Sequence, residues 1–213
     1  MQGLIGKKLG MTQVYDGDGA RVPVTVIEAG PCVVVQRKTK AADGYEAVQL
    51  GFGDQKESRL TRAALGRFKA ANTTPRRCLA EFPVETDSPL KAGDVVSAQI
   101  LEGASHLDVS GVTKGKGFQG VVRRYRMRGG PVTHGGHSKR RVGSIGANSY
   151  PARVHKGHRM SGHMGNVNVT QQNLKVVELR GGDNLVLLKG AVPGPNGAVV
   201  LLRRALKKSG KGS

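Results

Sequence analysis

The fold class is decided by residues 22–38, which read Val22-Pro23-Val24-Thr25-Val26-Ile27-Glu28-Ala29-Gly30-Pro31-Cys32-Val33-Val34-Val35-Gln36-Arg37-Lys38. Valines alternate with other residues in the first part, and a second β-branched run with a basic end follows at 32–38. The string Glu28-Ala29-Gly30-Pro31 between them is typical of a turn. Two β-branched runs separated by a turn predict two neighbouring strands.

The same pattern continues on both sides of this stretch. Further strands are expected at 45–52, 77–84, 95–101, 107–112, 174–179, 185–188 and 199–202, with turns at 43–44, 91–94, 181–184 and 193–196. One helix is expected in the first half, capped by Ser58, with Leu60, Ala63, Ala64 and Phe68 at helical spacing and an end before Thr74-Pro75. Many short strands joined by turns favour an antiparallel barrel or sandwich over βαβ units.

One long interval breaks this pattern. Between Asp108 and Glu178 there is no acidic residue, yet the interval holds 13 Lys and Arg and five of the six histidines. Apart from a short helix expected at 118–126, hydrophobic periodicity is absent there. Strands precede and follow the interval, so we expect a body of residues 1–112 with 170–213 and an inserted basic loop of residues 113–169. Residues 203–213 are expected to form a mobile basic tail.

The charge of the chain points to a polyanionic partner. Its 213 residues carry a net charge of +19, and its pI is about 10.5. Nucleic acid is the commonest polyanion, with anionic membranes and heparin-like sugars as alternatives. Ordering roughly 50 residues of backbone costs tens of kcal/mol, which contacts to phosphate groups are able to offset.

RNA suits the interval better than DNA, because it lacks repeats and a recognisable groove-reading helix. Arg forks onto phosphates or stacks on bases, and His reads base edges or 2′-hydroxyls. The basic residues expected to contact RNA are Lys114, Lys116, Arg123, Arg124, Arg126, Arg128, Lys139, Arg140, Arg141, Arg153, Lys156 and Arg159, together with His134, His137 and His163.

Other functions find little support. Residues 115–120 match G-x-G-x-x-G, but no acid follows about 20 residues later to bind a ribose, so an oxidoreductase that uses a dinucleotide is a rival interpretation only. The pairs His134/His137 and His155/His158 have no nearby acid or cysteine to complete a metal shell, so no metal or other cofactor is expected. The sequence contains no G-x-S-x-G and no Walker loop, and neither an enzymatic activity nor a small-molecule substrate is expected.

Cys32 and Cys78 are expected to be reduced thiols, although a disulfide between them stays open. No apolar run is long enough for a signal peptide or a membrane span. The chain is therefore expected to be soluble and cytoplasmic, with no membrane partner.

Several strings resemble the bacterial ribosomal protein L-three family of the large subunit. They are Gly3-Leu4-Ile5-Gly6-Lys7-Lys8-Leu9-Gly10-Met11-Thr12-Gln13, residues 23–32, Lys114-Gly115-Lys116-Gly117-Phe118-Gln119-Gly120, His134-Gly135, Gly143-Ser144-Ile145-Gly146, Met160-x-Gly162-His163-Met164-Gly165, Val169-Thr170-x-Gln172-Asn173-Leu174 and Lys189-Gly190-Ala191-Val192-Pro193-Gly194. They lie in register over almost the whole chain, and several long strings together are highly specific.

The resemblance implies a mainly β protein, a β-barrel of the translation-protein type with minor α, that carries a long irregular basic extension. It implies binding to large-subunit ribosomal RNA and neighbouring ribosomal proteins, support of early subunit assembly, and chemistry left to the RNA. Residues Gly143, Ser144, Ile145, Gly146, Ala147 and Asn148 would form the loop tip near the peptidyl transferase centre. Phe118, Ser144 and Asn148 join the expected RNA contacts on this basis.

One position departs from the family pattern. Many bacterial members carry a glutamine directly after the Gly-Ser-Ile-Gly string, and in some it is methylated. This chain has Ala147 there, so it should lack that modification.

Overall fold

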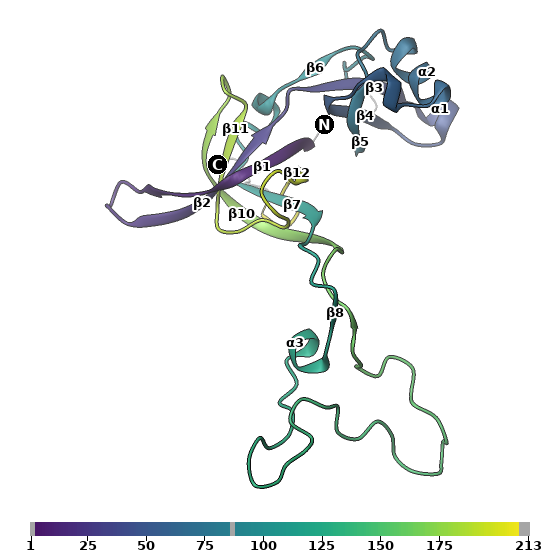
Figure 1. Cartoon of the computed structure of the whole chain (residues 1–213). Coiled ribbons are helices and arrows are strands. Elements are labelled where there is room, and N and C mark those ends of the chain that lie inside the picture. The colour runs from purple at the N-terminus through teal and green to yellow at the C-terminus, as the bar shows by residue number, and fades with distance from the viewer. Residues whose placement is uncertain (1–2, 86–87, 209–213) are drawn as a thin grey trace. The chain divides into compact units, whose positions relative to one another are not determined.

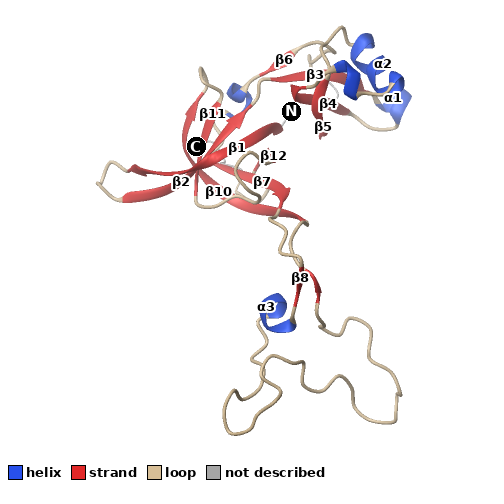
Figure 2. Cartoon of the chain, in the orientation of Figure 1, coloured by secondary structure: helices blue, strands red, loops and turns tan. Residues whose placement is uncertain are grey.

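The computed structural model describes residues 3–85 and 88–208, and it is built mainly of β-strands (Figures 1 and 2). The strands are β1 Gly3–Tyr15, β2 Arg21–Ala29, β3 Cys32–Lys38, β4 Ala47–Asp54, β5 Arg76–Pro83, β6 Val95–Val96, β7 His106–Val112, β8 Phe118–Gln119, β9 Gly162–His163, β10 Asn168–Arg180, β11 Leu185–Lys189 and β12 Val199–Arg204. The α-helices are α1 Lys40–Asp43, α2 Arg62–Ala70 and α3 Val121–Tyr125, and 3-10 turns lie at Glu57–Arg59 and Ala98–Leu101.

The chain folds as two compact units. One contains the described residues up to Val112 and from Asn168 onward, and the other is Thr113–Val167. The last two residues of the loop predicted at 113–169 belong to strand β10, which begins at Asn168.

The first unit is centred on a closed six-stranded barrel. Its strands follow the order β1-β12-β7-β10-β11-β2, and every neighbouring pair is antiparallel. The inward side chains include Leu4, Ile27, Leu107, Leu188 and Leu202, all fully buried. The prediction of a mainly β protein with a barrel is confirmed.

Strand β1 closes the barrel by pairing with β12 on one side and β2 on the other. Gly6 is required in this strand, because a Cβ there would lie 2.8 Å from the carbonyl oxygen of Glu28. The Lys8 ammonium is buried and donates to the carbonyl oxygens of Val192 and Gly194, each at 3.1 Å. A buried ammonium needs such acceptors, so Lys8 fixes the connection between β11 and β12 to the barrel wall.

A smaller sheet of order β5-β4-β3-β6 shares the core of the barrel. Strand β4 is buried on both faces from Ala47 to Phe52, and its neighbours contribute Val34 and Phe82 to the same hydrophobic cluster. Because β2 runs into β3 after the turn at Gly30-Pro31, residues 22–38 link the two sheets.

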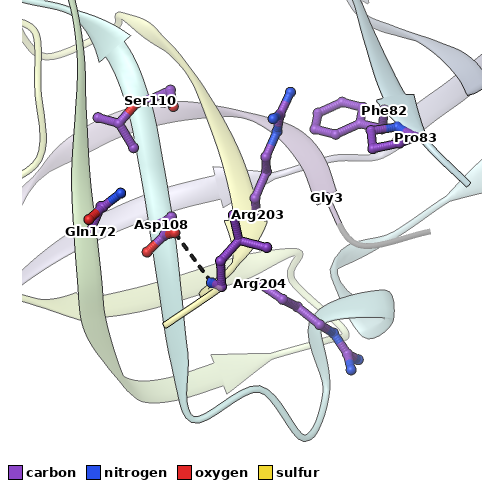
Figure 3. A pocket seen from close by; sticks show the side chains of 10 residues that line it. Gly3, Phe82, Pro83, Asp108, Ser110, Gln172, Arg203 and Arg204 are labelled. Carbon is purple, nitrogen blue, oxygen red and sulfur yellow. Dashed lines mark hydrogen bonds between the residues drawn. The ribbon is translucent and has the colours of Figure 1, made fainter. Parts of the chain in front are cut away.

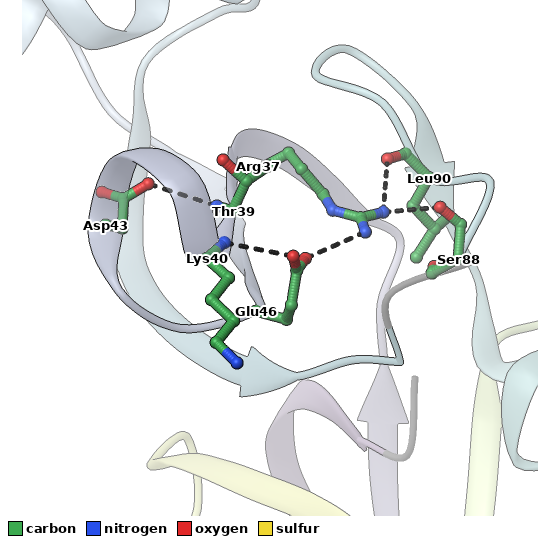
Figure 4. A network of polar contacts seen from close by, with 7 residues as sticks. All are labelled: Arg37, Thr39, Lys40, Asp43, Glu46, Ser88 and Leu90. Carbon is green, nitrogen blue, oxygen red and sulfur yellow. Dashed lines mark hydrogen bonds and ion pairs between the residues drawn. The ribbon is translucent and has the colours of Figure 1, made fainter.

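A polar network fastens α1 and the segment 88–90 to the end of β3 (Figure 4). Arg37 donates to Glu46 at 3.2 Å and to the carbonyl oxygen of Ser88 at 2.5 Å. The Lys40 backbone N–H donates to the other Glu46 oxygen at 3.1 Å. These donors, the Lys40 N–H first and the Arg37 guanidinium second, hold the pKa of the Glu46 carboxyl below its usual value.

Cys32 and Cys78 are both free thiols. Cys32 is buried and donates to the carbonyl oxygen of Ile5 at 3.4 Å. Burial raises the pKa of the Cys32 thiol to about 12, so it stays protonated and unreactive at neutral pH.

Three local predictions need correction. Helix α2 is capped by Thr61, whose hydroxyl accepts from the Ala64 N–H at 3.4 Å, whereas Ser58 belongs to a separate 3-10 turn. The strand expected at 95–101 stops at Val96 and continues as a 3-10 turn that buries Ala98 and Leu101. The helix expected at 118–126 is shorter, since residues 118–119 are extended.

The expected tail at 203–213 begins inside β12, which ends at Arg204, and its residues 209–213 lie outside the described part of the chain. In the described residues no helix is long and apolar enough to span a membrane.

Candidate nucleic-acid interface

The unit Thr113–Val167, which lies within the acid-free interval, is inserted between β7 and β10, and its two ends form a narrow stem. Thr113 and Val167 bond through their backbones at 3.0 Å, and the Thr113 hydroxyl donates to the Val167 carbonyl oxygen at 3.2 Å. Further along, the Lys116 N–H donates to the Met164 oxygen at 2.9 Å, and the Met164 N–H donates to Gly117 at 3.0 Å. Strands β8 and β9 continue the pairing, with Phe118 opposite His163.

The close pairing of the stem depends on one glycine, Gly165. Gly165 has a φ of +76°, a left-handed conformation that residues with a Cβ rarely adopt. A Cβ there would also collide with the carbonyl oxygen of Lys114 and lie 3.0 Å from the Gly115 Cα. The two arms of the stem therefore approach closely only because residue 165 has no side chain.

Helix α3 ends the stem and builds a small cluster. Val121 is the only buried residue of 113–167, all of which the structure describes. The Tyr125 ring has the guanidinium groups of Arg124 and Arg159 at 5.0 and 5.6 Å from its centroid. Arg124 also donates to the Met160 carbonyl oxygen at 2.8 Å, so this cluster joins the two arms without any acid.

Residues 126–161 have almost no structure of their own. Apart from an isolated bridge between Asn148 and Pro151, no strand or helix forms in this fully described stretch. Its backbone hydrogen bonds are few and include a loop contact from the Gly130 N–H to the Lys139 carbonyl oxygen at 2.9 Å and a turn contact from the Arg141 N–H to the Ser138 carbonyl oxygen at 2.6 Å. Folded proteins make roughly one hydrogen bond per residue, so most backbone groups here are left for solvent or a partner.

The charges of the interval are also left for a partner. Residues 113–167 hold 12 of the 34 Lys and Arg and no Asp or Glu. The four ion pairs found in the described residues, Arg37–Glu46, Lys38–Glu81, Arg76–Asp54 and Arg180–Glu178, all lie in the other unit. Of the 12 cations only Arg124 is half-buried, and the other 11 are exposed.

The residues predicted from sequence fall into three groups within the unit. Lys114, Lys116, Phe118 and His163 lie on the stem, and Arg123, Arg124 and Arg126 lie on α3 or at its end. The irregular stretch holds Arg128, His134, His137, Lys139, Arg140, Arg141, Ser144, Asn148, Arg153, Lys156 and Arg159. Phe118 is 76% exposed, which leaves its ring free to stack on a base.

Residues Gly143–Asn148, the tip expected from the resemblance, are all exposed. The Ser144 hydroxyl donates to the Gly146 carbonyl oxygen at 2.8 Å, although the backbone of 142–147 forms no regular turn. Ile145 is 49% exposed, so this string presents an apolar side chain at the surface.

Sequence reasoning did not select Tyr125 and Tyr150. Tyr150 is 89% exposed, and two guanidinium groups lie within 5.6 Å of the centroid of the Tyr125 ring. These two residues could have been predicted from the sequence, because they are aromatic residues inside an acid-free interval and unpaired bases stack on aromatic rings.

The structure also shows where the sequence motifs for a dinucleotide site or a metal site lie. The G-x-G-x-x-G string at 115–120 lies in an antiparallel stem, without the parallel strand and long helix that a dinucleotide site requires. Within residues 3–85 and 88–208, no three His, Cys, Asp or Glu side chains gather into a group able to hold a metal ion.

Comparisons with known proteins agree on one family. Residues 87–185 match the family model described as Ribosomal protein L3. The chain is 50% identical over 211 residues to the large ribosomal subunit protein uL3 of Brachyspira hyodysenteriae, covering 99% of this chain and 97% of that protein. It is 48% identical over the same length and shares of both chains to the uL3 protein of Brachyspira pilosicoli.

The stem geometry predicts that Gly165→Ala opens the stem. The left-handed backbone costs an L-residue about 1–2 kcal/mol, and the clash with Lys114 adds to that cost. Hydrogen exchange of the Lys116 and Met164 amides should become roughly 5–30 times faster. Gly143→Ala is the matched control, because a Cβ there meets nothing within 4 Å. Unchanged exchange in Gly165→Ala would show that the stem does not depend on this glycine.

Proposed function

The chain belongs to the ribosomal protein L3 family, and we propose that it binds large-subunit ribosomal RNA mainly through the basic unit Thr113–Val167. It is a structural constituent of the large ribosomal subunit. In this proposal the barrel unit is the folded anchor, and the basic unit reaches into RNA toward the peptidyl transferase centre.

One observation supports the proposal most: the basic unit combines cations that have no acidic partner with peptide groups that have no hydrogen-bond partner in the protein. None of the eleven exposed cations has an acidic partner in the described residues, and most of the peptide groups of 126–161 lack a protein partner there. RNA supplies both kinds of partner, since phosphates bind cations and 2′-hydroxyls donate to and accept from peptide groups. Water satisfies the peptide groups of a solvated loop but does not neutralise its positive charges, and a membrane surface contacts only one side of such a segment.

The side chains suit folded RNA better than a regular duplex. Exposed aromatic rings at Phe118 and Tyr150 are placed to stack on unpaired bases, and the arginines are able to fork onto phosphates. A general DNA-binding protein would need an element that enters a groove, and α3, with five residues, is too short to follow one.

The tip at Gly143–Asn148 is proposed to lie against the RNA of the catalytic centre, on the resemblance already described. Ser144 and Asn148 offer neutral hydrogen-bonding groups there, and Arg153 a charge. None of the 12 cations has a carboxylate or a nucleophile arranged beside it, so we assign the bond-forming chemistry to the RNA and a bracing role to the protein.

Early assembly follows from the same geometry. A segment that is ordered only by surrounding RNA has to be in place before the RNA compacts, because a long irregular chain is hard to thread into a finished structure. We therefore propose that the chain joins the subunit early, and that the exposed surfaces of the barrel unit remain for neighbouring ribosomal proteins.

Salt dependence tests the RNA contacts. If about half of the cations meet phosphates, the plot of log affinity against log salt for ribosomal RNA should have a slope of about −4 to −6. Changing Arg140 and Arg141 to Gln should reduce that slope by roughly 1.5, because each phosphate contact releases about 0.7–0.9 counterions. Fluorescence anisotropy of a labelled RNA over a salt series measures both slopes.

The matched control changes Arg62 and Lys69 on α2 to Gln. Both are exposed cations of the barrel unit, so the net charge falls equally while the proposed contacts remain. Equal slope changes in the two double variants would contradict the proposal and indicate unspecific attraction to the whole charge of the chain.

The tip is tested by a tethered cleavage reagent. Ala147→Cys, in a Cys78→Ser background, carries an iron chelate that generates hydroxyl radicals, and the labelled chain is incorporated into large subunits. Cleavage of the RNA at the peptidyl transferase centre is expected, and the same chelate on Ser58→Cys, outside the basic unit, should cleave elsewhere. Cuts from residue 147 that avoid the catalytic centre would overturn this part of the proposal.

A further inference from the structure

The barrel unit contains a pocket that the basic extension does not involve (Figure 3). It has a volume of about 270 Å³ and is lined by Gly3, Phe82, Pro83, Asp108, Ser110, Thr170, Gln172, Arg203, Arg204 and Leu206. These residues come from β1, β5, β7, β10, the end of β12 and the segment just after it. Pockets for drug-sized ligands typically measure about 300–1,000 Å³, so this one fits a smaller group.

Arg203 is held in place at this pocket by an aromatic ring. Its guanidinium lies 5.5 Å from the centroid of Phe82, and Figure 3 shows the side chain extending toward that ring. Phe82 is able to occupy this position because residue 3 is glycine, where a Cβ would lie 2.5 Å from the Phe82 ring atoms. No hydrogen bond or ion pair of the Arg203 guanidinium occurs in the described residues, so its outer face is open for a second planar partner.

The neighbouring arginine is used differently. Arg204 donates to the carbonyl oxygens of Ile100 and Glu102, both at 3.0 Å, and in Figure 3 it points away from Phe82. Arg204 is therefore a structural tie, and Arg203 is the arginine available to a ligand.

A β-bulge brings polar groups to the same pocket. The register of β10 against β7 shifts between Gln171 and Leu174, and Asp108 holds the bulge by accepting from the Asn173 N–H at 2.7 Å. Bulges re-aim side chains, and here Gln172 lines the pocket. Its amide has no partner in the described residues and is free to donate and accept on one edge of a ligand.

The one acid at the pocket is already engaged. Asp108 is 8% exposed, and its two oxygens accept from the N–H groups of Asn173 and Leu206, at 2.7 and 3.5 Å. Arg203 and Arg204 line the pocket, and Lys207 and Lys208 follow the lining residue Leu206 directly in the chain, so the charges in this part of the chain are positive. An anionic ligand is therefore attracted, and its planar part meets Arg203.

We propose that this pocket receives one unpaired nucleotide of the ribosomal RNA, with its base stacked on Arg203, its edge read by Gln172 and its phosphates near Lys207 and Lys208. The inference rests on the proposed binding to RNA but concerns a second contact, on the barrel unit. It makes the barrel a reader of a single RNA position as well as an anchor.

A photo-crosslinking amino acid identifies the occupant directly. Leu206 lines the pocket and is 81% exposed, so replacing it with p-benzoylphenylalanine leaves the core intact. In assembled large subunits, light should attach this residue to a single unpaired nucleotide, located by the stop of reverse transcription. A crosslink to a neighbouring protein, or no crosslink to RNA, would overturn the inference.

Substitutions at Arg203 test how the nucleotide is held. Arg203→Ala should weaken RNA binding about fivefold to tenfold and abolish the specific crosslink. Arg203→Lys should restore part of the affinity but little of the crosslink, because an ammonium keeps the charge without a planar face. Arg62→Ala, which removes another exposed cation of the barrel unit from α2, is the control. An Arg203→Ala effect no larger than that of Arg62→Ala would contradict the role of Arg203.

Failure here is distinguishable from failure of the proposed function. The Arg140/Arg141 double variant should lower the yield of the Leu206 crosslink without moving its position. If that variant binds RNA normally while the crosslink persists, the result contradicts the proposed role of the extension and supports the contact at the pocket.

Discussion

Between Thr113 and Val167, twelve positive charges share one segment with no acidic residue to neutralise them, and this constraint governs the rest of the structure. Inside the segment only the stem and α3 make enough contacts to fix the backbone, and Val121 is its single buried side chain. Self-repulsion and conformational entropy both oppose order in the remaining residues. An external polyanion relieves both at once, which is why the segment and its partner have to be considered together.

The barrel strands bring the two ends of this segment together. Strands β7 and β10 pair as far as Val112 and Asn168, and the next residues along the chain, Thr113 and Val167, bond to each other. The ends of the segment are thus brought together by the folded unit, so the entropy of closing a 55-residue loop is already met before RNA binds. The proposed second RNA contact belongs to the same barrel unit, because the bulge at Gln172 and the Phe82–Arg203 contact build a pocket from residues of that unit alone.

The sequence predicted the elements whose signal is local. Short apolar runs predicted β2, β3, β7, β11 and β12 to within a few residues. Strand β1 lacked such a signal, because Gly3, Gly6 and Gly10 and the adjacent Lys7 and Lys8 interrupt its apolar residues, and it is specified by pairing with β2 and β12 instead. Thr61 replaces Ser58 as the cap because a 3-10 turn precedes the helix, which propensity alone does not show.

Some residues of the candidate sites could likewise be predicted from the sequence, and others could be found only in the folded structure. Composition selected the cations of the basic unit, because charge is visible in any segment whatever its fold. The exposure of Tyr150, the clamping of Tyr125 and the pocket at Arg203 depend on contacts between residues far apart in the chain, from Gly3 to Leu206. No pattern within a short window carries that information.

The most direct test of the account is hydrogen exchange of residues 126–161, measured by mass spectrometry in the free chain and in the assembled large subunit. The account predicts exchange near the rate of an unfolded peptide in the free chain and strong protection in the subunit, while the barrel strands are protected in both. Equal protection of 126–161 in the free chain would contradict it, because the segment would then be ordered by its own contacts and not by RNA.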